Sequence, residues 1–92
     1  KSVEQTTLDV IKDAGYGEFF MHGTGHGIGL EVHTLPRISW VNHDPLITNN
    51  VITIEPGIYL ADWGGVRIED DCQILDSGCM PLNRSTKELL VL

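Results

Sequence analysis

Ninety-two residues, of which 41% are hydrophobic and 21% charged, form one small globular domain at most, because so short a chain cannot enclose a large core. Thirteen acidic against six basic residues give a net charge of −7, which argues against nucleic acid or an anionic membrane surface as the main partner. No apolar run approaches the roughly 20 residues that span a bilayer, and the first ten residues lack a signal-peptide core, so we expect a cytoplasmic protein.

Residues 2–14 predict the first element, an α-helix. Ser2 and Gln5 have the spacing of a capping box, in which Ser2 caps the first turn and Gln5 reaches back to it. Apolar residues recur at roughly helical intervals, and Gly15 is the natural stop. A cap at the second residue is an abrupt opening for a whole protein, so we expect that preceding sequence has been cut away.

After this helix the pattern changes to that of strands. Short apolar runs flank a glycine-rich segment, and a further run precedes the sequence Asn-His-Asp-Pro, which is typical of a turn. The strands expected in this region are residues 18–21, 30–33 and 38–41.

The second half of the chain holds the two strongest strand candidates, residues 51–60 and 66–75, which are rich in β-branched side chains. The connection 61–65, Ala-Asp-Trp-Gly-Gly, favours an antiparallel hairpin because its glycines permit positive φ. Residues 76–78 supply another turn. Residues 85–92 predict a short final helix or strand, since the serine and glutamate there have capping-box spacing.

The segment HGTGHGIGLEVH, residues 22–33, packs three of the four histidines and four glycines into twelve positions. His22 and His26 are four residues apart, as on a zinc-protease helix, but each glycine in a helix interior costs about 1 kcal/mol. The segment is better interpreted as extended or irregular backbone that another group approaches closely, with His22, Thr24 and His26 pointing the same way. A glycine-rich turn whose histidines only bond to neighbouring backbone is the alternative.

Two strands carry carboxylates in unusual positions. Glu55 lies inside an otherwise apolar strand, held on extended backbone by the proline that follows it. Alternation places Arg67, Glu69 and Asp71 on one face of the next strand. If the strands pair, Glu55 and Glu69 face each other, which is unfavourable unless a cation lies between them. An outward-facing carboxylate is the alternative for Glu55, and a solvated strand edge is the alternative for residues 69–71.

One histidine with two carboxylates is a ligand set suited to Mn²⁺, Co²⁺, Fe²⁺ or Zn²⁺ rather than to a thiolate site. We expect Arg67 to orient one of the carboxylates and His33 to be a polar group near the reacting centre. His43 is expected on an exposed loop.

The remaining aromatic and sulfur side chains suggest no chemistry of their own. Trp40 and Trp63 are expected to serve as packing or as pocket walls. Cys72 and Cys79 form no Cys-x-x-Cys pair, and we expect two ordinary reduced thiols.

Three motifs in this order, HGTGHGIGLEVH, TIEPGIY and GVRIEDD, resemble the C-terminal half of the pita-bread metallopeptidases, closest to the Xaa-Pro aminopeptidases and Xaa-Pro dipeptidases, or prolidases. The methionine aminopeptidases share GHGIG and TIEP, but their third motif differs. The resemblance implies an α+β fold, the C-terminal portion of a pita-bread fold, with an antiparallel sheet and flanking helices. It also implies that residues 1–92 are a C-terminal fragment of the catalytic metallopeptidase domain.

The resemblance assigns roles to individual residues. It implies that His26 binds one metal ion, that Glu55 binds the same ion and assists proton transfer, and that Glu69 bridges two ions. His22 and His33 would line the substrate site, where they hold the scissile carbonyl or stabilise the tetrahedral intermediate. The implied cofactors are two divalent ions, with Mn²⁺ expected first and Co²⁺, Zn²⁺ or Fe²⁺ as alternatives.

The sequence departs from the family pattern in three respects. Thr34 stands where members usually have Glu, and Asn49 and Asn50 stand where Pro-Gly is common, although Asn tolerates left-handed backbone. Two aspartate ligands that the family takes from an earlier part of the chain are missing before His22. We therefore expect these residues alone to be inactive.

The resemblance implies hydrolysis of peptide bonds involving proline, with a proline-containing peptide as the partner, neither nucleic acid nor membrane, and a homodimer left open. Two other functions are considered. One is a metal-free pita-bread module that binds peptides or proteins, as in histone-chaperone subunits, and the other is a self-contained mononuclear metal protein. Retention of His26, Glu55 and Glu69 together argues against the metal-free module.

Overall fold

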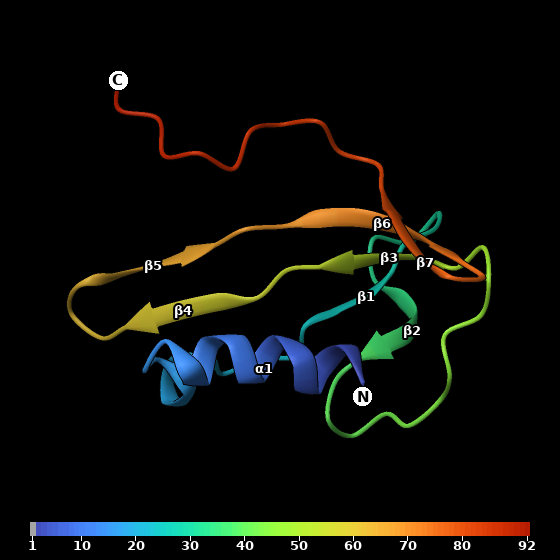
Figure 1. Ribbon diagram of the computed structural model, residues 1–92, viewed down its shortest axis with the longest axis horizontal. Helices are drawn as coiled ribbons and strands as arrows, with labels where there is room; N and C mark the ends of the chain where they lie inside the picture. Colours follow the sequence, from blue (N-terminus) through green and yellow to red (C-terminus); the bar gives the residue numbers. More distant parts are fainter. Residues whose placement is uncertain (1) are drawn as a thin grey trace.

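The computed structural model describes residues 2–92, which form one long helix packed against antiparallel strands (Figure 1). The elements are α1 (Val3–Asp13), the 3-10 helix η1 (Gly17–Phe19), β1 (Gly25–Gly27), β2 (Thr34–Ile38), β3 (Val51–Ile54), β4 (Gly57–Leu60), β5 (Gly64–Arg67), β6 (Asp70–Leu75) and β7 (Gly78–Pro81). A five-stranded sheet has the order β2-β1-β3-β6-β7, and β4 and β5 pair separately.

Helix α1 begins and ends near the predicted positions. The Ser2 hydroxyl accepts a hydrogen bond from the Gln5 backbone N–H at 3.1 Å, so the predicted N-cap is confirmed. The prediction that the Gln5 side chain reaches back to Ser2 is wrong, because this side chain donates instead to Asp9, one turn later, at 2.7 Å. Gly15, with φ of 88°, ends the helix in a left-handed conformation that glycine adopts without a Cβ penalty.

The predicted hairpin between residues 51–60 and 66–75 is confirmed. Strand β3 continues into β4, and β5 continues into β6, as two long antiparallel ribbons that run above α1 (Figure 1). Ile54 pairs with Asp70 and Gly57 with Arg67, so the register places Glu55 opposite Glu69 at the interruption between the two sheets. The chain reverses near Asp62, which has a φ of 61°.

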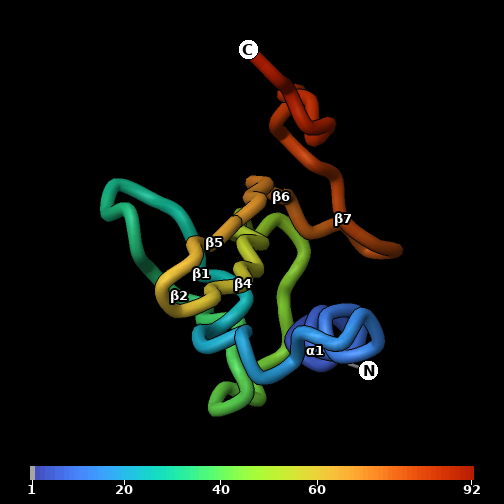
Figure 2. Tube along the Cα trace, turned by 90° about the vertical axis from the view of Figure 1, so that its left-hand side faces the viewer, coloured from blue at the N-terminus to red at the C-terminus, as the bar shows by residue number. Residues whose placement is uncertain are grey.

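The two faces of this hairpin have different compositions because side chains alternate along a strand. Ile52 and Cys72 pair and lie on one face, where they form the buried core with Ile38. Val3 from α1 packs against this core, and Figure 2 shows the helix on one side of the strands. Thr53 and its neighbours at alternate positions face the other way, so the helix covers one face and leaves the opposite face to the histidines.

Several short elements differ from the predictions. Residues 18–21 do not form a strand: the first two belong to the 3-10 helix η1 and the other two have no regular structure. Residues 30–33 form bends that precede β2. Strand β2 ends at Ile38, so the predicted strand 38–41 is wrong beyond its first residue. Residues 82–92 form neither a helix nor a strand. These runs are too short or too isolated for the local sequence pattern to determine their secondary structure, which depends instead on packing.

Three smaller predictions are decided by the strands and turns. Asn49 has a φ of 73°, so it does take the left-handed conformation expected of it. Strand β6 lies between β3 and β7, so the alternative of a solvated strand edge is wrong for Asp71. Cys72 and Cys79 are both free thiols, as predicted. Within residues 2–92 no helix has the length and apolar character needed to cross a membrane.

Candidate metal and peptide site

The glycines around His26 lie where strands approach most closely. A Cβ on Gly25 would collide with the carbonyl oxygen of Thr53 in β3, and a Cβ on Gly27 would collide with the carbonyl oxygen of Leu35. Strand β1 therefore fits between β2 and β3 only because these positions lack side chains. The prediction of extended, closely approached backbone is confirmed, and the approaching groups are the neighbouring strands.

His26 and Glu55 come together on the face opposite the helix. The His26 Nδ1 lies 2.8 Å from the carbonyl oxygen of Gly27, which can only accept, so Nδ1 carries the proton. The other ring nitrogen, Nε2, lies 2.9 Å from the Glu55 carboxylate oxygen Oε1, and both side chains are about 85% buried. Two acceptor atoms at this distance need a shared positive charge, which either a proton on Nε2 or a metal ion supplies.

The backbone on both sides of this contact is fixed by strand pairing. Glu55 donates its N–H to the carbonyl oxygen of Thr24 at 2.7 Å, and His26 donates its N–H to the Thr53 hydroxyl at 3.0 Å. The same hydroxyl lies 2.9 Å from Glu55 Oε1. The imidazole and the carboxylate are therefore held on rigid strands, which suits a site that needs precise ligand placement.

Arg67 lies between the two facing carboxylates. Its Nε is 3.6 Å from Glu55 Oε2, and its Nη2 is 3.4 Å from Glu69 Oε2. The predicted juxtaposition of Glu55 and Glu69 is therefore present in the backbone register, with the guanidinium neutralising both charges. Arg67 is also placed as predicted, against a carboxylate of the candidate site. Glu69 itself does not reach His26, and the described residues hold no group of three or more His, Cys, Asp or Glu side chains suited to one metal ion.

His22 lies at the edge of the same face, held by two partners. Its Nδ1 donates to the carbonyl oxygen of Gly23 at 2.8 Å, and its Nε2 accepts from the Tyr59 hydroxyl at 2.7 Å. Phe20 contacts the ring edge-on, with centroids 5.5 Å apart. These contacts fix both the tautomer and the orientation of the imidazole. Sequence reasoning missed Tyr59, although it stands four residues after Glu55 in the quoted motif.

His33 packs against His26 at the mouth of a cleft. The two ring centroids are 4.4 Å apart, and His33 is exposed whereas the His26 side chain is largely buried. The cleft has a volume of about 680 Å³, and Trp40 forms part of its wall, as predicted. His22 and Glu55 also line it, so four of the predicted functional side chains open onto one space. A concave site with a few convergent polar groups is the usual form of a small-ligand site.

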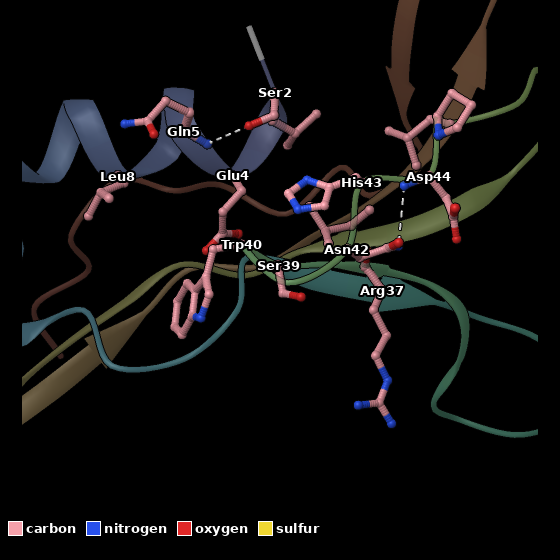
Figure 3. Close-up of a pocket in the computed structure, with 14 residues that line it drawn as sticks. Ser2, Glu4, Gln5, Leu8, Arg37, Ser39, Trp40, Asn42, His43 and Asp44 are labelled. Carbon is pink, nitrogen blue, oxygen red and sulfur yellow. Dashed lines mark hydrogen bonds between the residues drawn. The ribbon is translucent and has the colours of Figure 1, made fainter.

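Two predictions about peripheral residues have opposite outcomes. His43 is exposed on its loop, as predicted, and lines a second pocket next to α1 (Figure 3). Trp63 is 84% exposed at the tip of the long hairpin, so the prediction that it packs or forms a pocket wall is wrong. A tryptophan in a short connection carries no local signal for what it contacts.

Glu4 is a buried carboxylate that sequence reasoning did not single out. It is 6% exposed, and its Oε2 accepts the backbone N–H of Thr24 at 2.9 Å. Figure 3 shows its side chain reaching from α1 toward the segment that carries Ser39 and Trp40. The only sequence signal is its place in the first turn of the helix, where acidic residues are common at the surface, so burial could not be foreseen.

Comparison with known proteins agrees with this architecture. The chain matches the description "Metallopeptidase family M24" over residues 1–76. It is 47% identical to the Xaa-Pro dipeptidase of Pyrococcus furiosus over 90 residues, which cover 98% of this chain and 26% of that protein. The chain therefore spans about a quarter of the length of this relative.

Solved structures of the same kind superpose closely. The structure is similar to the Xaa-Pro dipeptidase from Bacillus anthracis, with a TM-score of 0.93 and 45% identity over 97% of this chain and 25% of that chain. It is also similar to the X-Pro aminopeptidase from Thermotoga maritima MSB8, with a TM-score of 0.92 and 46% identity over the same shares. The antiparallel strands and helix are thus a portion of the pita-bread fold, and the chain belongs to metallopeptidase family M24.

Proposed function

We propose that this chain supplies the C-terminal part of the active site of a metal-dependent exopeptidase that hydrolyses peptide bonds involving proline. The observation that carries this proposal is the 2.9 Å contact between His26 Nε2 and Glu55 Oε1 in a cleft that His22 and His33 also line. Relatives with Xaa-Pro dipeptidase and X-Pro aminopeptidase names support both versions of the activity. On this proposal residues 1–92 are a C-terminal fragment of the catalytic domain.

The proposed cofactors are two divalent ions, with Mn²⁺ as the first to test. His26 Nε2 and Glu55 Oε1 fit such an ion because one is an imidazole nitrogen with its lone pair directed outward and the other a nearly buried carboxylate oxygen. Glu69 is the third proposed ligand from this chain. A divalent ion, when bound, supplies a water of lowered pKa and polarises the scissile carbonyl.

The chain's own residues have separate roles in the proposed reaction. Glu55 takes a proton from the attacking water and returns it to the leaving proline nitrogen. His33, on the exposed side of the cleft, binds the carbonyl oxygen as it gains negative charge. His22, whose ring is fixed by Gly23 and Tyr59, forms a rigid wall that orients the peptide.

Release of proline from Ala-Pro, or of the first residue from an X-Pro-Y peptide, tests this activity in the full chain that the gene encodes, with Mn²⁺ added. We expect Glu55→Gln to lower kcat by at least about 100-fold, since it removes the proton acceptor. The matched control is Glu18→Gln, a change of the same kind at an exposed residue of η1, which should retain full rates. On this proposal residues 1–92 alone should show no turnover, because the two further aspartate ligands expected of the site are not among them.

A metal-free binding module is the second candidate, and one observation favours it. The Arg67 guanidinium lies within 3.6 Å of Glu55 and 3.4 Å of Glu69, so it can neutralise both carboxylates without a metal ion. Calorimetric titration of the full chain with Mn²⁺ separates the two, because only the peptidase requires saturable binding. A cytoplasmic location and a homodimer stay predictions.

A further inference from the structure

Thr53 is a buried residue directly beneath the His26–Glu55 contact. It lies in β3, two residues before Glu55, and is 2% exposed. Because side chains two apart in a strand point the same way, its hydroxyl and the Glu55 carboxylate share a face. Threonine is β-branched and stiff about its first side-chain torsion, so its hydroxyl is held in a fixed direction.

The hydrogen bonds of this hydroxyl have only one consistent arrangement. The His26 backbone N–H can only donate, so at 3.0 Å the Thr53 Oγ1 must accept from it. The hydroxyl's single proton then points to Glu55 Oε1, 2.9 Å away, which as a carboxylate oxygen can only accept. Thr53 therefore ties the backbone of one proposed ligand to the side chain of the other.

Because Glu55 Oε1 accepts this hydrogen bond, only its other lone pair is available to a further partner. One lone pair accepts the Thr53 hydroxyl, and the same oxygen lies 2.9 Å from His26 Nε2. Arg67 contacts the other carboxylate oxygen, so rotation of the carboxylate would break contacts at both ends. Groups that hold metal ligands in this way typically change metal affinity by about 10- to 100-fold when they are removed.

We propose that Thr53 is a positioning residue of the metal site, whose hydroxyl sets the Glu55 carboxylate against the His26 imidazole and thereby sets the affinity for a divalent cation. The inference rests on the proposed function, since it assumes that these two side chains are ligands. It goes beyond that function by assigning a role to a third residue, which does not bind the ion but holds the two ligands in position.

Calorimetric titration of the full encoded chain with Mn²⁺ tests this role. Thr53→Val keeps the shape of the side chain and removes the hydroxyl, and we expect it to weaken Mn²⁺ binding by about 10- to 100-fold. Thr53→Ser keeps the hydroxyl and should restore affinity to within about threefold of the unsubstituted protein. Thr53→Ala takes the place of the valine variant if that one does not fold.

Thr48→Val is the matched control, because the Thr48 hydroxyl also donates to a carboxylate, Asp76, at 2.6 Å, but Thr48 lies in an exposed turn and does not line the cleft that holds His26 and Glu55. It should leave Mn²⁺ affinity unchanged, which separates loss of this particular hydroxyl from loss of any threonine hydroxyl. Equal affinity of the unsubstituted protein and Thr53→Val would overturn the role of Thr53 and leave the proposed function standing. No Mn²⁺ binding by the unsubstituted protein would contradict both.

Discussion

Among single residues, some buried polar atoms have a hydrogen-bond partner and others have none. Glu4 Oε2 accepts a hydrogen bond from Thr24, but Glu4 Oε1 and the hydroxyls of Thr24 and Ser39 are buried without a partner among the described residues. Carboxylates are rarely buried unless they are paired with another group. The Thr24 backbone joins α1 to the site, because its N–H is held by Glu4 while its carbonyl accepts from Glu55.

Glu4→Ala removes the acceptor for the Thr24 N–H and leaves that donor buried. We expect the free energy of unfolding to fall by about 1 to 3 kcal/mol, the usual cost of an unsatisfied buried group. Urea denaturation followed by circular dichroism measures this loss. Glu18→Ala at an exposed position should change stability by less than about 0.5 kcal/mol, and equal effects of the two substitutions would show that Glu4 anchors nothing.

The two thiols should react very differently. Burial, together with the neighbouring Cys79 and the acidic residues Asp70 and Asp71, raises the pKa of Cys72 to about 11. At pH 8 Cys72 is therefore a protonated, covered thiol, whereas Cys79 is exposed. Labelling with iodoacetamide should modify Cys79 alone in the native protein and both residues in urea. Native labelling of Cys72 at a comparable rate would contradict this placement.

The raised pKa of Cys72 also sets a pH dependence of stability. Above the ordinary thiol value of about 9, the unfolded chain loses this proton while the folded chain keeps it until about pH 11. Stability contributed by the neutral thiol is thus complete below pH 9 and falls as the pH rises from 9 to 11. Cys72→Ala should flatten this part of the curve of unfolding free energy against pH, and an unchanged slope would contradict the assignment.

Strands and turns determine which side chains meet. The glycines of β1 allow β2 and β3 to approach from both sides, which brings His26 over Thr53 and Glu55. Gly25→Ala should destabilise the fold by about 1 to 3 kcal/mol, because a methyl group would overlap the Thr53 carbonyl oxygen. The denaturant concentration at the midpoint of unfolding measures this loss of stability.

Gly29→Ala is the control, since a Cβ there meets only the Thr34 methyl group at an ordinary 3.7 Å. It should unfold at nearly the same denaturant concentration as the unsubstituted chain. If both variants lose the same stability, steric crowding of the strands is not the reason for glycine at position 25.

Elements with a strong local signal could be predicted from the sequence. The Ser2 cap, the long hairpin and the facing positions of Glu55 and Glu69 all follow from spacing and period. Arg67 between the carboxylates could not be foreseen in detail, because a long side chain reaches several partners from one backbone position. The hydroxyl of Thr53 was missed because a lone threonine in a β-strand is ordinary, and only the register with β1 reveals its two partners.

At the scale of the whole molecule, one face of the hairpin packs on α1 and the other carries the site. This division follows from alternation in β3 and β6, where the core residues Ile52 and Cys72 point toward the helix side. Large apolar side chains also remain exposed, among them Leu30, Val32 and Trp63. The chain spans about a quarter of the relatives' length.

The central claim is that the His26 imidazole and the Glu55 carboxylate bind the same divalent ion. Pulsed electron paramagnetic resonance of the full encoded chain with one equivalent of Mn²⁺ tests it directly, because a bound imidazole nitrogen couples to the metal's electron spins. We predict a ¹⁴N coupling that disappears in His26→Ala and persists in His43→Ala, whose side chain lies on an exposed loop. A spectrum without this coupling, or one that His26→Ala leaves unchanged, would contradict the account.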